Sequence, residues 1–217
     1  MNRRALVLLS LMLTTNLLLS KDYYFKQLII TPNTFTNLND TLIQETFIMK
    51  DLVVVKDEIS IQFTDDSTYT FYNMVDSTYF KKNAEELAAV SMYADSQFEE
   101  FNITPTKETG KVGNWKVEKY IGSTKVMGME MELDLFVAKD TGLPNDILFR
   151  QQEKMSNNAP NIKKMLDKIK NTGGIVVKEV ARIQGMMTSA KETIVAKEIK
   201  INKKMIERPK GFSVLQK

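Results

Sequence analysis

Apolar residues follow two different spacings along this chain, and the spacing predicts the secondary structure. Alternation with a period of two, or a short run of β-branched and aromatic residues, indicates β-strands. The strands predicted in this way cover residues 23–30, 41–49, 52–55, 59–63, 68–74, 77–81, 115–121, 125–138, 147–153, 175–184 and 191–201. Turns such as Asp65-Asp66-Ser67 are so short that the strands they join must be antiparallel neighbours.

Two segments repeat their apolar residues at helical spacing instead. Asn83 and Glu86 form a capping-box pattern, and Thr104-Pro105 ends the segment that follows them. Pro160 fits a first helical position, and Gly173-Gly174 stops the second segment. The apolar positions of the two helices are Leu87, Val90, Ala94, Phe98 and Phe101, and then Ile162, Met165, Leu166 and Ile169. This order of strands and helices predicts an α+β fold with antiparallel pairing.

The most regular alternation is a comb of apolar residues at every odd position from Met127 to Val137. If the whole stretch is one strand, these side chains point to one face and the acids between them point to water. The comb consists of Met127, Met129, Met131, Leu133, Leu135 and Val137. Such a row forms either plain core or a compliant apolar wall, because unbranched methionine repacks around ligands of varied shape. Trp115, on the strand before it, is either core or the edge of a pocket.

The first twenty residues have the composition of a secretory signal. Arg3 and Arg4 precede the mostly apolar stretch 5–19, which is too short to span a bilayer, and cleavage is expected after Ser20. Residues 21–217 are then long enough for a single domain with a substantial core. The expected location is the periplasm or the exterior. An uncleaved membrane anchor is the alternative.

The composition excludes several kinds of chemistry. The chain has no cysteine and no histidine. Disulfides, thiolate nucleophiles and thiolate metal sites are therefore absent, and so are the commonest general base and the commonest metal ligand. Adjacent acids such as Glu85-Glu86 and Glu99-Glu100 diverge on a helix and make no acid/base couple. We expect no enzyme activity, no cofactor and no metal.

Charge is unevenly distributed along the chain. Residues 161–217 hold fourteen basic residues against five acids, although the net charge of the whole chain is only +3. Either the basic strands pair with acidic central strands across the sheet, or the basic third contacts an anionic membrane surface or an acidic partner. The clusters Lys203-Lys204 and 208–210 lack interleaved aromatic residues that could stack on bases. Nucleic-acid binding is not expected.

Several motifs, taken in their order along the chain, resemble those of a known family. They are the segments 76–80, 112–120, 135–144 (Leu-Phe-Val-Ala-Lys-Asp-Thr-Gly-Leu-Pro) and 206–212 (Ile-Glu-Arg-Pro-Lys-Gly-Phe). Together they resemble a bacterial exported domain of unknown function that is similar to the outer-membrane lipoprotein carrier group. The resemblance implies a strongly curved antiparallel β-sheet, a half-barrel, with two amphipathic helices covering its concave face and a hydrophobic cavity between them.

The expected function follows from this combination of pattern and resemblance. We expect a non-enzymatic periplasmic or secreted protein that binds a lipid or acyl chain between sheet and helices. The expected ligand-binding residues are Met127, Met129, Met131, Leu133, Leu135, Trp115, Val90 and Met165. The alternative is an envelope protein-interaction or stress-sensing module with a solid core and no small-molecule ligand.

Overall fold

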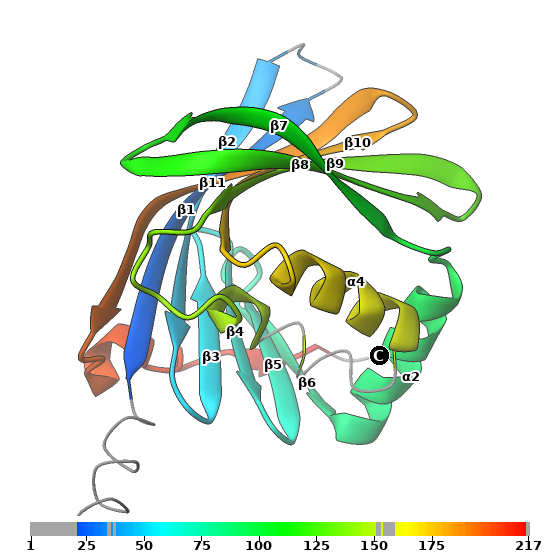
Figure 1. Cartoon of the computed structure of the whole chain (residues 1–217). Helices are drawn as coiled ribbons and strands as arrows, with labels where there is room; N and C mark the ends of the chain where they lie inside the picture. Colours follow the sequence, from blue (N-terminus) through cyan, green and yellow to red (C-terminus); the bar gives the residue numbers. More distant parts are fainter. Residues whose placement is uncertain (1–20, 34–35, 37, 151–152, 154–158, 216–217) are drawn as a thin grey trace, which may run out of the picture.

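A twelve-stranded open sheet forms most of the molecule (Figure 1). The structure is a computed structural model that describes residues 21–33, 36, 38–150, 153 and 159–215, so the expected signal segment 1–20 lies outside the described residues. The strands are β1 Asp22–Asn33, β2 Leu38–Ile48, β3 Leu52–Lys56, β4 Ser60–Asp65, β5 Thr68–Asn73, β6 Thr78–Asn83, β7 Asn102–Val112, β8 Trp115–Val126, β9 Met129–Ala138, β10 Ile175–Ile183, β11 Met186–Ile199 and β12 Ser213–Val214.

The strand order is β12-β6-β5-β4-β3-β2-β1-β11-β10-β9-β8-β7. Neighbours pair antiparallel, except that β12 pairs parallel with β6, so the sheet is mixed rather than purely antiparallel as predicted. The pairing of β1 with β11 joins the beginning of the described chain to its last long strand. This single junction links the β2–β6 meander to the β7–β10 strands.

Two α-helices belong to the described part of the chain, and both begin where the sequence predicts. The helices are α2 Ala84–Ser96 and α4 Pro160–Lys170, with the 3-10 turns η1 Ile147–Phe149 and η2 Lys203–Ile206. The Asn83 side chain accepts a hydrogen bond from the Glu86 backbone N–H, and Glu86 accepts one from the Asn83 N–H, which confirms the capping box. No helix among the described residues is long and apolar enough to cross a membrane.

Three local predictions are wrong in their boundaries. Helix α2 ends at Ser96 instead of near Thr104, and the strand β7, which was not predicted, follows it. The irregular middle of β7 hides its alternation, because the register shifts after Pro105 and Lys107 has a positive φ of 65°. β7 is also an edge strand, where proline is tolerated.

The gap between the predicted strands 115–121 and 125–138 places a turn at Gly122-Ser123, but the turn between β8 and β9 lies at Met127-Gly128 and includes the first comb residue. Met127 has φ 52° and Gly128 has φ 77°, the backbone of a two-residue hairpin turn that matches strand twist. β8 therefore continues through Gly122, where an added Cβ would come within 2.4 Å of the Phe101 ring. Gly122 is a contact point for Phe101 and not a turn residue.

The stretch 147–153, predicted as a strand, instead begins with the turn η1. Residues 151 and 152 lie outside the described residues. Three strands still separate the two helices, because β7 replaces the strand that was expected here.

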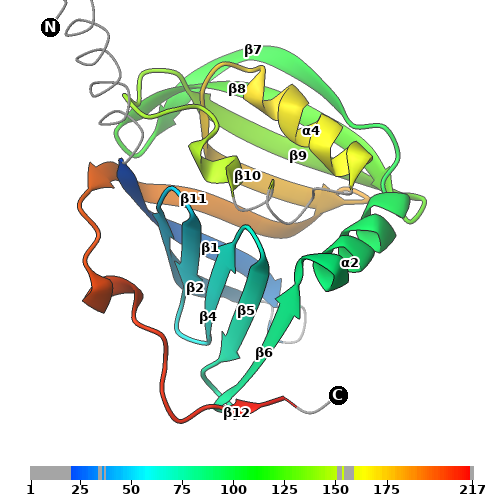
Figure 2. The same ribbon diagram turned by 90° about the horizontal axis from the view of Figure 1, so that it is seen from below.

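The sheet has two covered faces, which we call the helix face and the tail face. On the helix face, Leu166 and Ile169 of α4 pack with Leu133 and Leu135 of β9. On the tail face, the buried residues are Phe47, Val54, Phe63 and Tyr72. The segment 201–212 covers the tail face, and Figure 2 shows it passing along the β2–β6 strands to β12.

Contacts of the tail segment explain where its basic residues lie. The Arg208 guanidinium lies 4.6 Å from the centre of the Phe63 ring, and the Phe212 ring meets the Tyr72 ring edge-on at 5.5 Å. The Ser213 N–H donates to the Ser77 carbonyl at 3.1 Å. The segment 201–212 of the basic C-terminal third therefore has a structural role, because it packs against the tail face of the sheet.

Candidate functional site

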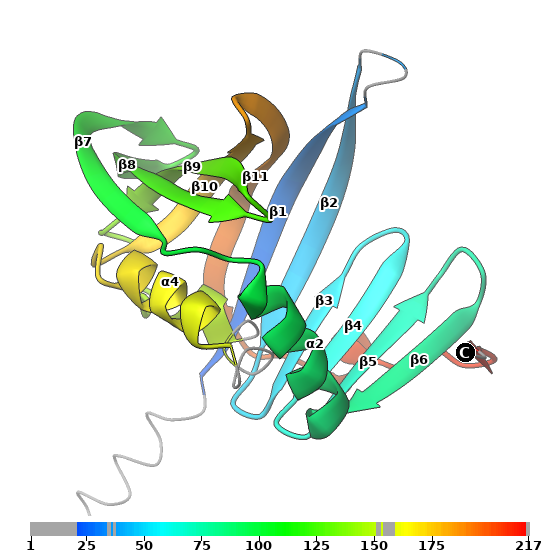
Figure 3. The ribbon, with the colours of Figure 1, turned by 90° about the vertical axis from the view of Figure 1, so that its right-hand side faces the viewer.

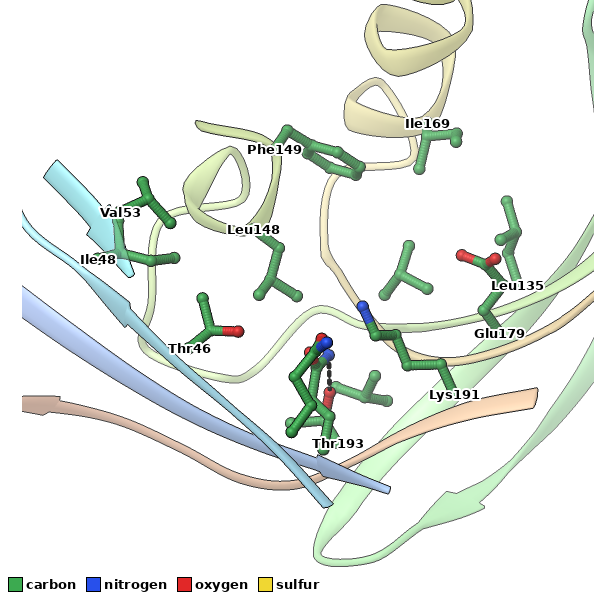
Figure 4. A pocket seen from close by; sticks show the side chains of 14 residues that line it. Thr46, Ile48, Val53, Leu135, Leu148, Phe149, Ile169, Glu179, Lys191 and Thr193 are labelled. Atoms are coloured by element: carbon green, nitrogen blue, oxygen red, sulfur yellow. Dashed lines mark hydrogen bonds between the residues drawn. The ribbon is translucent and has the colours of Figure 1, made fainter. Parts of the chain in front are cut away.

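A cavity of about 90 Å³ lies between the helix face of the sheet and the segments η1 and α4 (Figure 4). More than half of the residues around it are apolar, and they come from strands on one side and from η1 and α4 on the other. The apolar lining residues are Ile48, Val53, Leu135, Leu148, Phe149, Ile169, Val176 and Val177. The cavity is smaller than an engineered apolar cavity of about 150 Å³ that holds benzene. A long acyl chain needs more space than this cavity provides.

Polar side chains form the other part of the lining. They are Gln27, Gln44, Thr46, Glu179, Lys191 and Thr193. Cross-strand pairing places them together: Gln27 lies opposite both Gln44 and Thr193, and Glu179 lies opposite Lys191. The Gln27 side-chain amide donates a hydrogen bond of 3.2 Å to the Thr193 hydroxyl. The cavity is therefore amphipathic rather than purely apolar, because β1, β2, β10 and β11 contribute polar groups.

Glu179 and Lys191 are the charged residues of this lining. Figure 4 shows both side chains extending from their strands into the cavity. Burial raises the pKa of Glu179, although the nearby Lys191 lowers it in part. Burial lowers the pKa of Lys191, and Glu179 opposes that shift. Each charge therefore carries a desolvation penalty that the other only partly offsets.

The roof of the cavity is held in place by a contact between the two helices. The Asp95 carboxylate, buried at the end of α2, accepts hydrogen bonds from the Asn161 and Ile162 backbone N–H groups at 2.7 and 2.8 Å. These donors are unsatisfied at any helix start, and α4 has no cap of its own because its N-cap residue is Ala159. Figure 3 shows α2 and α4 as neighbours across this contact.

The structure divides the predicted comb into a buried part and an exposed part. Leu133 and Leu135 are buried against α4, and Leu135 also lines the cavity. Met131 is half-buried at the edge of the same cluster. Met127 is 66% exposed and Met129 37% exposed, so the prediction that these two face the core is wrong. The reason is the Met127-Gly128 turn, which places both at a hairpin tip.

The other predicted site residues also lie outside the cavity lining. Val90 is 49% exposed, because α2 buries only Ser91 and Asp95 among its residues. Met165 is half-buried and packs against the cluster formed by α4 and β9. Trp115 is half-buried at the start of β8. Of the eight predicted binding residues, Leu135 is the one that the cavity lining includes.

Two of the three acids between the comb positions, Glu132 and Asp134, form ion pairs across the sheet with basic side chains of β8 and β10. Arg182 of β10 contacts Asp134 at 2.8 Å and Glu132 at 3.5 Å. Lys119 of β8 approaches Asp134 at 3.4 Å. The Arg182 contacts confirm, for β10, the prediction that basic C-terminal strands pair with acidic central ones. Among the described residues, no three acids lie close enough together to hold a metal ion.

The polar lining residues were missed by sequence analysis. Gln27 is a buried polar residue between the apolar Phe25 and Ile29 of β1, whereas Thr193 lies between Lys191 and Val195 of β11. Their proximity depends on the β1–β11 pairing. Glu179 follows a β-bulge between Val176 and Lys178, which sets the face on which it lies. A polar residue at an otherwise inward strand position was the available signal.

Comparisons with known proteins give a fold but no family. No family model and no curated protein matches the sequence. Among solved structures, the chain resembles an uncharacterized conserved protein from Thermus thermophilus, with a TM-score of 0.54 and 9% identity over 92% of each chain. That likeness shows a shared fold alone. A structure of PNGF-II aligns with a TM-score of 0.44 and 14% identity, covering 91% of this chain and 31% of that one, which is too distant to support an argument.

Proposed function

We propose that this chain is a non-enzymatic periplasmic or secreted protein that binds an apolar molecule, a lipid or acyl chain, between its sheet and its helices. The observation that carries the proposal is the cavity beneath η1 and α4, whose lining is mostly apolar. Enclosed sites with apolar walls and a few convergent polar groups are typical of small-molecule binding. The absence of histidine and cysteine from the whole chain favours binding over catalysis.

The proposal includes a strongly curved half-barrel with α2 and α4 over its concave face, similar to the lipoprotein carrier group. The bend of the sheet in Figures 1 and 3 and the packing of α4 on β9 support this arrangement. Because the cavity is small, binding of an acyl chain involves an outward shift of the roof residues Leu148, Phe149 and Ile169. Leu148 and Phe149 belong to η1, and Ile169 belongs to α4.

Native mass spectrometry of protein purified from its own envelope tests this function. We expect a stoichiometric adduct of lipid mass on the wild type. Leu148→Trp, which fills the cavity from its roof, should abolish the adduct. Leu143→Trp is the matched control. Leu143, like Leu148, is half-buried and packs against the hydrophobic cluster that includes Ile147, but it does not line the cavity. A bare wild-type chain would refute the proposal.

An exposed patch supports the second candidate, an envelope protein-interaction module. The tips of the β8–β9 and β10–β11 hairpins carry Met127 and Met186, which are 66% and 69% exposed. A hydrogen bond from the Gln184 N–H to the Glu130 carbonyl at 2.8 Å connects the two tips. Exposed methionines at neighbouring positions are common on adaptable binding surfaces. A bare chain in the mass-spectrometry experiment would favour this candidate.

A further inference from the structure

Glu179 and Lys191 form a charged pair inside the cavity that is not joined into an ion pair. They are direct cross-strand partners on β10 and β11. Among the described residues, neither the Glu179 carboxylate nor the Lys191 ammonium has a hydrogen-bond or ion-pair partner. Both belong to the cavity lining, so the unpartnered groups face the cavity.

The adjacent residue pair on the same two strands is an internal comparison. Lys178 and Glu192, also cross-strand partners, form an ion pair of 3.0 Å on the tail face. Strands β10 and β11 can therefore bring a lysine and a glutamate into contact. Glu179 and Lys191 remain apart although they lie one position further along, where burial makes an unformed ion pair more costly.

The pair has no net charge, which restricts the ligand that it can accept. An enclosed site that gains a net charge loses stability, because an uncompensated ion in a poorly solvated place is unfavourable. A group that carries both signs leaves the site neutral and satisfies both side chains. Cross-strand side chains begin about 5 Å apart, so one compact group can reach both.

The remaining lining fits the same kind of ligand. Gln27 and Thr193, hydrogen-bonded to each other, lie beside the pair and offer further polar contacts. The opposite wall is apolar, with Leu148, Phe149 and Ile169 on η1 and α4. All six polar lining residues lie on strands and the three roof residues are apolar, although the strands also contribute five apolar residues. A polar head can therefore lie against β10 and β11 while a tail lies against the roof.

We propose that the cavity binds an amphiphile with a zwitterionic head that carries a primary ammonium and an acid group, with the ammonium on Glu179 and the acid group on Lys191. This inference rests on the proposed function and specifies its ligand class. A phospholipid head with an ethanolamine group has this chemistry, and so does a free amino-acid-like zwitterion. The apolar roof favours the lipid source.

The test uses the full chain, delipidated, and titration calorimetry with three lauroyl amphiphiles below their micelle concentrations. They are lysophosphatidylethanolamine, lysophosphatidylglycerol and monolauroylglycerol, which share a tail and differ in head charge. We expect the zwitterionic probe to bind about tenfold more tightly than the other two, the effect of roughly one satisfied charge contact. Phosphoethanolamine without a tail should bind far more weakly.

Three variants separate the head from the tail. Glu179→Gln leaves Lys191 as the one charged residue of the pair, so lysophosphatidylglycerol should become the tightest-binding probe. Lys191→Gln leaves Glu179 as the one charged residue, so the affinity for the anionic lysophosphatidylglycerol should fall most. The double variant Glu179→Gln/Lys191→Gln should bind all three probes about equally. Its urea midpoint, compared with the wild type, shows that the fold is intact.

The outcomes distinguish the two proposals. If all probes bind the wild type equally, or if its preference persists in the double variant, the head-group inference is wrong and the apolar-ligand function stands. If no amphiphile binds, the proposed function fails and the inference fails with it. If phosphoethanolamine alone binds as tightly as the lauroyl probe, the head assignment stands and the apolar-ligand function is wrong.

Discussion

Replacing the enclosed Glu179–Lys191 pair by apolar residues should stabilise the protein. In the double variant Glu179→Met/Lys191→Met, two desolvated charges without hydrogen bonds become apolar side chains of similar length beside an apolar wall. Replacing a buried charge pair in this way is often neutral or favourable, by about 1 to 4 kcal/mol. Because both side chains face a cavity and retain intermediate exposure, we expect the lower part of that range, about 1 to 2 kcal/mol.

The single variants should behave differently from the double variant. Each leaves one enclosed charge without its counter-charge, so each should be about 2 kcal/mol less stable than the double variant near neutral pH. In Lys191→Met, Glu179 keeps a pKa that burial raises, so the stability present at low pH is lost as the pH rises through the folded-state pKa. In Glu179→Met, Lys191 keeps a lowered pKa, so stability present at high pH is lost as the pH falls.

Urea unfolding at several pH values measures these effects. The only tryptophan, Trp115, is half-buried and reports tertiary unfolding by fluorescence, and far-UV circular dichroism gives a second probe. The matched control is Lys178→Met/Glu192→Met, which removes the ion pair on the tail face and should change stability by less than about 1 kcal/mol. A Glu179/Lys191 double variant more than about 1 kcal/mol less stable than the wild type would refute the reasoning.

Four further substitutions test the comb, the roof and one turn. Leu135→Ala should lower the free energy of unfolding by about 2 to 5 kcal/mol, whereas Met127→Ala should change it by less than about 0.5 kcal/mol; equal effects in urea would contradict the placement of the comb. Asp95→Ala should cost about 1 to 2 kcal/mol and speed amide exchange at the start of α4, and unchanged exchange there would exclude the capping role. Burial alone would raise the pKa of Asp65, but hydrogen bonds from Ser67 and Thr68 outweigh it and lower the pKa to about 2. As the pH falls from about 4 to about 2, the free energy of unfolding in urea should therefore decrease by about 1 kcal/mol more in the wild type than in Asp65→Ala.

Local sequence signals located most of the elements correctly because their causes are local. The Asp65 turn forms as predicted, with the carboxylate accepting from the Ser67 and Thr68 backbone N–H groups at 2.9 and 2.7 Å. Both helix starts were identified from Asn83 and Pro160, whose roles depend on a few adjacent residues. The predicted strand boundaries are wrong where the conformation of a residue depends on a contact with a residue far away in the sequence.

Gly122 and Gly128 illustrate that limit. Glycine is common in turns, and the predicted strands 115–121 and 125–138 place a turn at Gly122 but continue through Gly128. Gly128 has a positive φ and forms the turn, whereas Gly122 lies in β8 because Phe101 occupies the space of a side chain there. Nothing within the local sequence of β8 reports the position of Phe101. Because the turn was expected at Gly122, Met127 and Met129 were predicted inside a strand facing the core, whereas they lie at the exposed tip of the β8–β9 hairpin.

The cavity depends on contacts that are longer in range still. Gln27 and Thr193 meet because β1 pairs with β11, and the two residues are far apart in sequence. Periodicity gives the face of a residue within its own strand but not the strand that lies beside it. For this reason the pattern of β9 predicts a binding wall at the comb, whereas the proximity of the polar lining residues has no signal in the sequence of any single strand.

The distribution of side chains around the cavity also gives a direction to the proposed ligand. The polar groups come from β1, β2, β10 and β11, whereas Leu135 of β9 and the roof residues Phe149 and Ile169 are apolar. Beyond the cavity, Leu133 and Leu166 continue the apolar surface between β9 and α4. In the proposed complex, the head lies between β10 and β11, beside Glu179 and Lys191, and the tail points toward the β9–α4 contact. Because Leu133 and Leu166 pack closely there, a tail that enters this contact would require α4 to move away from β9, and the hydrogen bonds from the Asn161 and Ile162 N–H groups to Asp95 would keep the start of α4 attached to α2.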